Sequence, residues 1–501
     1  MATTTPRTPR ARVEARRRLL AFASLPVLTL ATAIALIPAI AAVGALIIVV
    51  PVAVAAGWYI IQRPDHGLYV LVFSITVFEN DAAGVLGFTD RWYEFAPGLP
   101  VQPADILILA IIVGLIVDLD NERRAPRISP WIWLPVPFLL AGMASGVLIG
   151  YTAGADLNTL LNSFRVFALL VVMAVMTAIT VDRYRLVTRL MNFWFALVTA
   201  KCAIGLLGWV LGAGRSLGST RITFYAPTMN YNSLVLILGV LALALKYGPG
   251  AVTRWQWIGL SVATLSLVLA FRRSFWIGLV LGIVLVVLVA SGKRGRPWVV
   301  LGGALVIAGG ALMLNAGGAT NSDNPVVQRA EIRDDAEDRY RLDEQTNVFG
   351  EIQRHQWTGI GLGVPWEARH PLSLEFGAGR NYTHVAVFFF WLKLGPMGVL
   401  GYFALIVATG ALGVRLWRLE LRHDPRLAAA GLALAIGVLA LAVVELTGTF
   451  TGASDRFGNA QMLLFGWLSA AVVASEATSR LALQPIKLHA PPTVSGRGRP
   501  R

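Results

Sequence analysis

The chain of 501 residues is 56% hydrophobic and only 14% charged. Soluble domains are roughly 45–50% apolar and about 25% charged, so this composition excludes an ordinary soluble domain and indicates a polytopic membrane protein. The net charge of +15 comes from short basic clusters between apolar runs. That pattern orients membrane proteins and lacks the basic face of a nucleic-acid-binding protein, so we expect membrane lipid and no nucleic acid as a partner.

Apolar runs long enough to cross a bilayer recur along the chain. A transmembrane helix needs about 20 apolar residues, and the sequence offers spans at 19–37, 39–61, 66–79, 104–118, 131–150, 164–180, 186–211, 231–246, 255–271, 274–290, 298–315, 384–411, 427–447 and 457–475. The predicted fold class is therefore an all-α polytopic membrane protein with about 14 transmembrane helices. One large extracytoplasmic loop precedes the twelfth helix.

The distribution of Lys and Arg predicts the orientation. With a cytoplasmic N-terminus, the basic clusters at 123–127, 183–189, 246–254, 293–296 and 415–426 all fall in cytoplasmic loops, as the positive-inside rule requires. The predicted organisation is a basic cytoplasmic tail (1–18), a transmembrane bundle (19–315), an extracytoplasmic loop (316–383), a second bundle (384–475) and a disordered cytoplasmic tail (476–501).

Several arginines fall on the predicted outer side, where the same rule expects few. Arg215 lies in a Gly-Arg-Ser turn that favours a local role, and the five candidates for a site are Arg221, Arg272, Arg273, Arg339 and Arg341. A guanidinium group presents a planar fork of donors that matches phosphate oxygens, so arginines that converge near the outer surface are suited to hold a diphosphate. The alternative is that they form local ion pairs or extend to lipid headgroups.

The large loop contains a charged stretch and a glycine pattern. Charges from Glu331 to His355 recur at helical spacing, which predicts a surface helix lying on the membrane as an alternative to a binding role for Arg339 and Arg341. Glycines at 359, 361 and 363 have no preceding strand and no following phosphate-loop lysine. We interpret them as a tight backbone turn and not as a nucleotide site.

His384 stands at the threshold of the twelfth span, beside Tyr382. An imidazole with an ordinary pKa near 6.5 is the natural general base, although a lone histidine is more often a structural group. The other histidines on this side, His355 and His370, lie 14 or more residues from it and from each other (384 − 370 = 14, 370 − 355 = 15). This spacing lacks a close pair of metal ligands, so we expect neither a metal nor a cofactor.

These motifs resemble the O-antigen ligase and O-antigen polymerase family of bacterial membrane enzymes. The resemblance covers roughly Arg221 to Gly401 and rests on Gln-Trp-Thr-Gly-Ile-Gly-Leu-Gly (356–363), on His384, and on Leu-Gly-Pro-Met-Gly-Val-Leu-Gly (394–401). Arg221 to Asn230 is similar to the family's entry to a middle span, and Arg272-Arg273-Ser274 to its Ser-Arg-Gly. Two residues depart from the family pattern, because Trp357 replaces a proline and Val385 an asparagine.

The resemblance implies inverting transfer or polymerisation of a glycan from an undecaprenyl-diphosphate carrier to an acceptor lipid, glycan or surface molecule. The reaction would take place on the outer face of the bacterial cytoplasmic membrane, with both chain termini cytoplasmic. His384 would be the base, the five arginines would hold the diphosphate, and Tyr382 and Asn230 would contact acceptor or sugar. A transporter or flippase for a lipid-linked anion is the alternative from another class, and a non-catalytic scaffold is a third.

Overall fold

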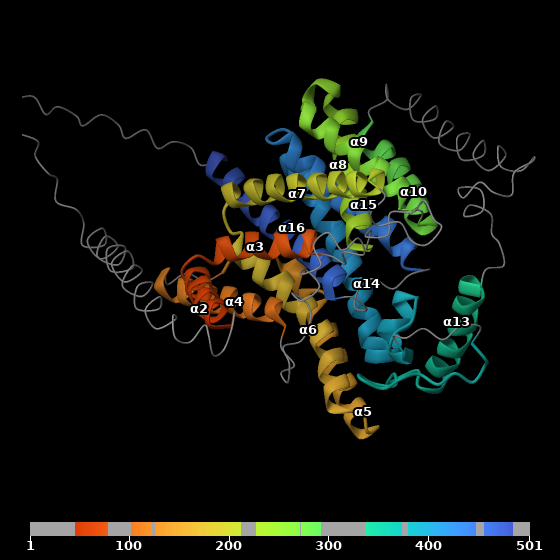
Figure 1. Cartoon of the computed structure of the whole chain (residues 1–501). Coiled ribbons are helices and arrows are strands. Elements are labelled where there is room, and N and C mark those ends of the chain that lie inside the picture. The colour runs from red at the N-terminus through yellow and green to blue at the C-terminus, as the bar shows by residue number, and fades with distance from the viewer. Residues whose placement is uncertain are drawn as a thin grey trace, which may run out of the picture.

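The computed structural model describes residues 46–78, 102–122, 126–211, 227–270, 272–291, 336–372, 379–446 and 455–483. Over these ranges the regular structure is entirely helical (Figure 1). The α-helices are α2 (Leu46–Gln62), α3 (Pro64–Val77), α4 (Pro103–Glu122), α5 (Val136–Thr152), α6 (Leu157–Thr180), α7 (Tyr184–Val210), α8 (Pro227–Tyr247), α9 (Arg254–Leu269), α10 (Arg273–Ala290), α13 (Ala336–Arg354), α14 (Ala386–Glu420), α15 (Pro425–Val444) and α16 (Asp455–Leu483). Short 3-10 turns lie at Pro130–Trp133, Pro249–Ala251 and Gly379–Asn381.

Seven of the described helical stretches are long and apolar enough to cross a membrane. They are Pro130–Thr152, Leu157–Thr180, Tyr184–Gly208, Thr228–Tyr247, Ala386–Glu420, Pro425–Val444 and Ala460–Ser479, with a shorter apolar helix at Ser274–Ala290. The all-helical, polytopic membrane class predicted from the sequence is confirmed. Helices lie at twelve of the fourteen predicted spans (14 − 2 = 12), and the spans at 19–37 and 298–315 lie outside the described residues.

Local sequence signals fix where several helices begin. The side chain of Asp156 accepts a hydrogen bond from the backbone N–H of Thr159, and α6 therefore begins at Leu157, before the apolar run itself. Thr253 and Gln256 form a reciprocal capping box at the start of α9. Such side chains satisfy backbone N–H groups that the first turn of a helix leaves without partners.

Two helices extend beyond their apolar runs. The 35-residue α14 continues through a break at Gly395, which has a φ of 66°, to end at Glu420. α16 runs to Leu483, past the boundary at 475 that the sequence predicted for a disordered tail. An ion pair of 2.6 Å between Arg415 of α14 and Glu476 of α16 accompanies this extension. Packing against a neighbour thus prolongs the helix where hydropathy alone ends it.

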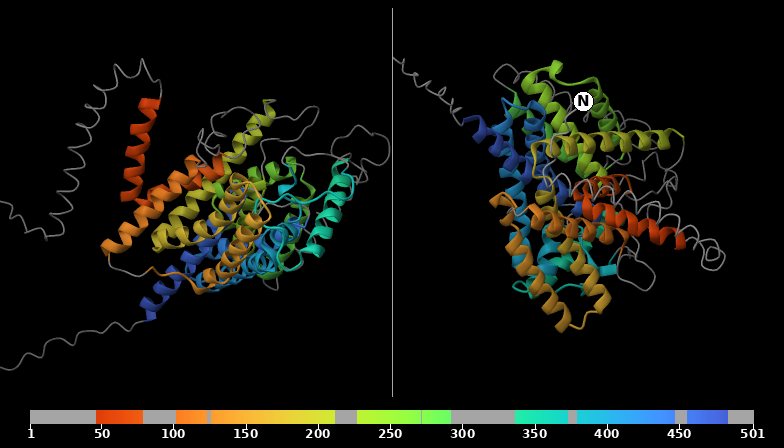
Figure 2. Two further views of the ribbon diagram at one scale, coloured as in Figure 1. Left: turned by 90° about the horizontal axis from the view of Figure 1, so that it is seen from below. Right: turned by 90° about the vertical axis from the view of Figure 1, so that its left-hand side faces the viewer.

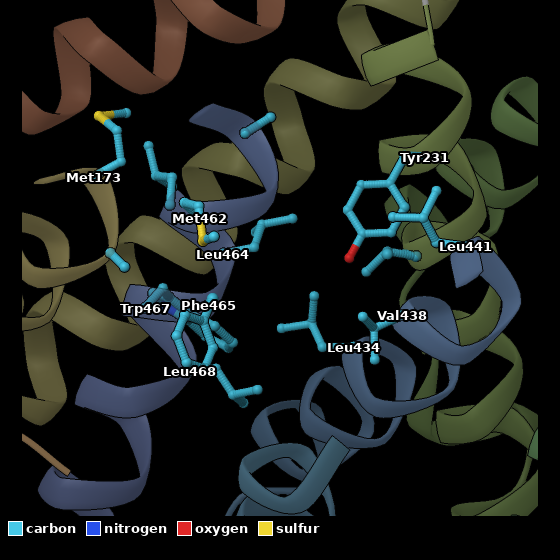
Figure 3. Close-up of a cluster of buried hydrophobic side chains, with 14 of the residues drawn as sticks. Met173, Tyr231, Leu434, Val438, Leu441, Met462, Leu464, Phe465, Trp467 and Leu468 are labelled. Carbon is cyan, nitrogen blue, oxygen red and sulfur yellow. The ribbon is translucent and has the colours of Figure 1, made fainter. Parts of the chain in front are cut away.

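The centre of the bundle is formed by α8 and α15, each with 78% of its apolar window buried. Figure 3 shows part of this core, to which α6 contributes Met173, α8 Tyr231, α15 Leu434, Val438 and Leu441, and α16 Met462, Leu464, Phe465, Trp467 and Leu468. Small residues bring backbones together elsewhere, as where Gly413 of α14 meets Gly431 of α15. Close approach at small residues is the usual basis of helix association in membranes.

One end of the bundle gathers the elements that carry the predicted site. Gly278, near the start of α10, packs against Val444 at the end of α15. The backbone N–H of Ala386, at the start of α14, donates to the carbonyl of Glu445 just beyond α15 (3.1 Å). Because α8 runs antiparallel to α15, with Tyr231 beside Gly437 and Gly239 beside Ala433, its start lies at this end too.

Candidate functional site

Helix α13 lies at the periphery of the molecule and packs against the start of α14 (Figures 1 and 2). Its exposed face carries Arg339, Leu342 and Phe349. The buried face consists of residues spaced one helical turn apart, namely Tyr340, Glu344, Asn347, Val348, Glu351 and Ile352. Residues three and four apart share one face of a helix. The charged stretch predicted as a surface helix therefore has one buried face, which packs against the rest of the protein.

A small apolar cluster holds α13 in place. Val348 and Ile352 pack with Ile360 and Trp366 of the following loop and with Leu392 of α14. This cluster is separate from the main core of the bundle over the described residues. The helix is therefore docked by apolar contacts that are independent of its buried charged residues.

The glycine-rich turn packs into the helix bundle. Gly359, Gly361 and Gly363 all have positive φ, at 67°, 90° and 76°. The backbone N–H of Ile360 donates to the carbonyl of Leu392 (2.7 Å), and that of Leu362 to the carbonyl of Gly146 (2.8 Å). The turn thus joins α14 to α5, as the interpretation of a tight backbone turn requires.

Trp366, which follows this turn in the sequence, supports the backbone next to His384. Its backbone N–H donates to the carbonyl of Arg380 (3.0 Å), and its indole N–H donates to the carbonyl of Tyr382 (2.9 Å). With an exposed fraction of 1%, the indole is a rigid support. These two hydrogen bonds fix the backbone immediately before His384.

His384 lies two residues before α14 and meets α13 through a carboxylate. Its Nδ1 lies 2.7 Å from Oε2 of Glu344, and its backbone N–H donates to the same oxygen (3.2 Å). The imidazole is 19% exposed and the carboxylate 1%. The rings of Tyr340 and Tyr382 pack edge-on against the imidazole, with centroid distances of 5.9 and 5.3 Å.

Burial and neighbouring charges shift the pKa values of both tyrosines. Burial, followed by the negative charge of Glu344, raises the pKa of Tyr340 to about 12. Burial and Glu344 also raise the pKa of Tyr382, whereas the positive charge of Arg341 acts to lower it. Arg341 is half-buried and within electrostatic reach of Tyr382. The described structure therefore brings together four of the residues that matter here: His384, Tyr382, Arg341 and Glu344.

The other predicted site residues that the structure describes lie on α13 and at the starts of α8 and α10. Arg339 is exposed on α13, one turn from Asp343. Asn230 is fully buried near the start of α8, and Arg272 is half-buried at the N-cap of α10. Both helices begin at the end of the bundle where His384 lies, and Arg273 opens α10. Arg221 lies outside the described residues.

Sequence reasoning missed Glu344. Its signal was the spacing of Tyr340, Glu344, Val348 and Ile352 on one face of a helix, which marks an apolar face interrupted by a carboxylate. The contact with His384 spans 40 residues of sequence and has no local signature.

Residues 258–403 match the family described as O-antigen ligase. No curated protein matches the chain. The matched region contains the glycine-rich turn, α13 and His384, as well as Arg272 and Arg341. The resemblance to the O-antigen ligase family inferred from the sequence is therefore confirmed over residues 258–403 of this helical membrane protein.

Proposed function

We propose that the protein transfers or polymerises a glycan from an undecaprenyl-diphosphate carrier to an acceptor hydroxyl at the outer face of the bacterial cytoplasmic membrane. The observation that carries this proposal is the position of His384, a partly exposed imidazole held between two tyrosines at the start of a membrane helix, with Arg341 nearby. An aromatic setting suits sugar rings, and a guanidinium suits phosphate.

In the proposed reaction the acceptor oxygen attacks the anomeric carbon of the carrier-linked sugar. The bond from that carbon to the diphosphate oxygen breaks, the configuration inverts, and the hydroxyl proton passes to His384. General-base catalysis of this kind is commonly worth about 10²–10⁴-fold. Tyr382 contacts the acceptor or sugar, and Asn230 does so from the start of α8.

Negative charge develops on the diphosphate as it leaves. Arg341 stabilises it, with Arg339, Arg221 and one or both of Arg272 and Arg273 completing the clamp. Donors positioned where charge develops usually make the largest single contribution to catalysis. The chemistry assigns no step to a metal or cofactor, because these side chains supply both the proton acceptor and the countercharge.

The test uses the purified full chain in lipid nanodiscs with a synthetic prenyl-diphosphate glycan and acceptor. We expect His384→Ala and Arg341→Ala each to lower the rate of product formation by at least about 10²-fold, while leaving the unfolding midpoint in detergent within a few degrees of the wild type. His355→Ala is the matched control, because His355 is exposed just after α13 and pairs with Glu351. Full activity in His384→Ala would refute the proposal, and movement of intact carrier-linked glycan without cleavage would indicate a flippase instead.

A further inference from the structure

We infer that Glu344 is a positioning residue for His384: it keeps the imidazole proton on Nδ1, so that Nε2 is the nitrogen that takes the proton of the acceptor hydroxyl. This inference rests on the proposed role of His384 as the base. Glu344 itself contacts neither sugar nor diphosphate in this scheme.

The geometry of the carboxylate supports this role. One oxygen, Oε2 of Glu344, lies 3.2 Å from the backbone nitrogen of His384 and 2.7 Å from Nδ1. An ionised carboxylate only accepts hydrogen bonds, so its partner at Nδ1 has to be an N–H. The ring distance falls in the range of charge-assisted hydrogen bonds. Backbone and ring are thus both held by one atom.

A purely structural role for Glu344 does not explain why a buried carboxylate occupies this position. Helix α13 is already docked by Val348 and Ile352 with Trp366, and Asn347 joins it to the loop by accepting from the backbone N–H groups of Arg369 and His370 (both 2.8 Å). A carboxylate that is 1% exposed costs free energy unless it is hydrogen-bonded. An apolar side chain at this position would dock the helix at lower cost.

The charge of Glu344 has a direct use during the reaction. When Nε2 accepts the proton of the hydroxyl, His384 becomes an imidazolium, and a fixed carboxylate at Nδ1 stabilises it without taking a proton. The proton leaves to solvent after the product departs. Among the residues that the structure describes, the titratable or charged groups near this pair include Tyr340 and Arg341 of α13 and Tyr382 of the preceding loop.

The chain offers a matched control for this role in Glu351. It lies on the same buried face of α13, seven residues on, is 4% exposed, and has its own histidine partner, His355, at 3.8 Å. We expect Glu344→Gln to lower kcat by about 10–100-fold, by analogy with the loss when the hydrogen-bond partner of a metal-ligating histidine is replaced, and to move the ascending limb of the pH–rate profile to lower pH. Glu344→Asp should restore that limb, and Glu351→Gln should leave rate and profile unchanged.

A second measurement is independent of activity. The protein has six histidines, and ¹⁵N labelling with His384→Gln for assignment should show His384 protonated at Nδ1 and not at Nε2 in the neutral form. A proton on Nε2 would overturn the inference even if the Glu344 variants failed to fold. So would a wild-type rate and profile in Glu344→Gln, or a loss of activity with an unshifted profile that aspartate does not restore. Activity in His384→Ala is a different result, because it removes the proposed function itself.

Discussion

The hydroxyl of Tyr402 donates a hydrogen bond of 2.6 Å to Oε2 of Glu445. Both side chains are 2% exposed, and the bond joins the middle of α14 to the end of α15. The backbone of Glu445 also receives the N–H of Ala386, two residues after His384. One residue at the end of α15 therefore holds α14 at two levels, which fixes the start of the helix that presents the histidine.

Removing this bond should destabilise the protein. Hydrogen bonds to charged groups contribute about 1.5–3 kcal/mol, so Tyr402→Phe and Glu445→Gln should each lower the midpoint of thermal unfolding in detergent. The double variant should lose less than the sum of the two, because Tyr402→Phe removes the donor and Glu445→Gln the charge of the acceptor in one and the same contact. Tyr59→Phe, which removes an exposed hydroxyl paired with His66, is the control. Additive losses would show that the two side chains act separately.

Alanine substitutions at two glycines, one in the glycine-rich turn and one outside it, can separate the cost of backbone strain from the cost of steric crowding. A Cβ on Gly361 would lie 2.4 Å from the backbone nitrogen of Gly150, whereas a Cβ on Gly154 would meet nothing within 4 Å. Both glycines have positive φ, at 90° and 78°, which costs an L-residue roughly 1–2 kcal/mol. Gly154→Ala should lose only that amount. Gly361→Ala should lose about 1–3 kcal/mol more from overpacking, together with transfer activity. Equal losses in the two variants would contradict insertion of the turn between α5 and α14.

The raised pKa of Tyr340 predicts that the protein loses stability at alkaline pH. Its pKa is raised from 10.0 to about 12 in the folded protein. Below about pH 10 the phenol is neutral in both folded and unfolded chains, so its contribution to stability is complete. Between about pH 10 and 12 the unfolded chain loses the proton first, and stability falls as pH rises. Tyr340→Phe should flatten this part of the curve of unfolding midpoint against pH, and Tyr151→Phe, at an exposed tyrosine, should not.

Hydropathy predicted the membrane helices because burial in lipid demands a long apolar run, and that demand is local in sequence. Their ends were less predictable. α6 begins early because Asp156 caps it, and α16 continues past 475 where Glu476 meets Arg415. In both places a polar contact accompanies a helix boundary that hydropathy does not mark.

The residues of the candidate site also differ in how far the sequence predicts them. His384 and Arg341 could be proposed from the sequence, because an imidazole at a helix start and a guanidinium on the predicted outer side are conspicuous in an apolar chain, and their roles stay predictions. Glu344 was missed, although the spacing of Tyr340, Val348 and Ile352 marks the helix face on which it lies, because its contact with His384 spans 40 residues of sequence and has no local signature. The three glycines predicted a turn, but the helices that receive it, α5 and α14, are known only from the folded chain.

The two arginines of α13 should differ in their effect on transfer. Arg341 is half-buried and acts on the pKa of Tyr382, whereas Arg339 is exposed. A charge in solvent is screened over about 8–10 Å at physiological salt, and a partly buried one much less. Arg341→Ala should therefore lower kcat by about 10²–10³-fold, the usual loss of a donor to a developing anion, and Arg339→Ala by a smaller factor that shrinks further as salt is raised.

The substitution Arg341→Lys tests whether the planar shape of the guanidinium group matters for transfer. A lysine keeps the charge but loses the planar fork, so Arg341→Lys should recover only part of the rate. Arg354→Ala is the matched control, since Arg354 ends the same helix and pairs with Glu351 at 2.6 Å, away from His384. Initial rates and inhibition by a prenyl diphosphate, measured for all four variants at low and high salt, decide the matter. A larger loss in Arg339→Ala than in Arg341→Ala would place the diphosphate on the solvent side of α13 and remove Arg341 from the clamp.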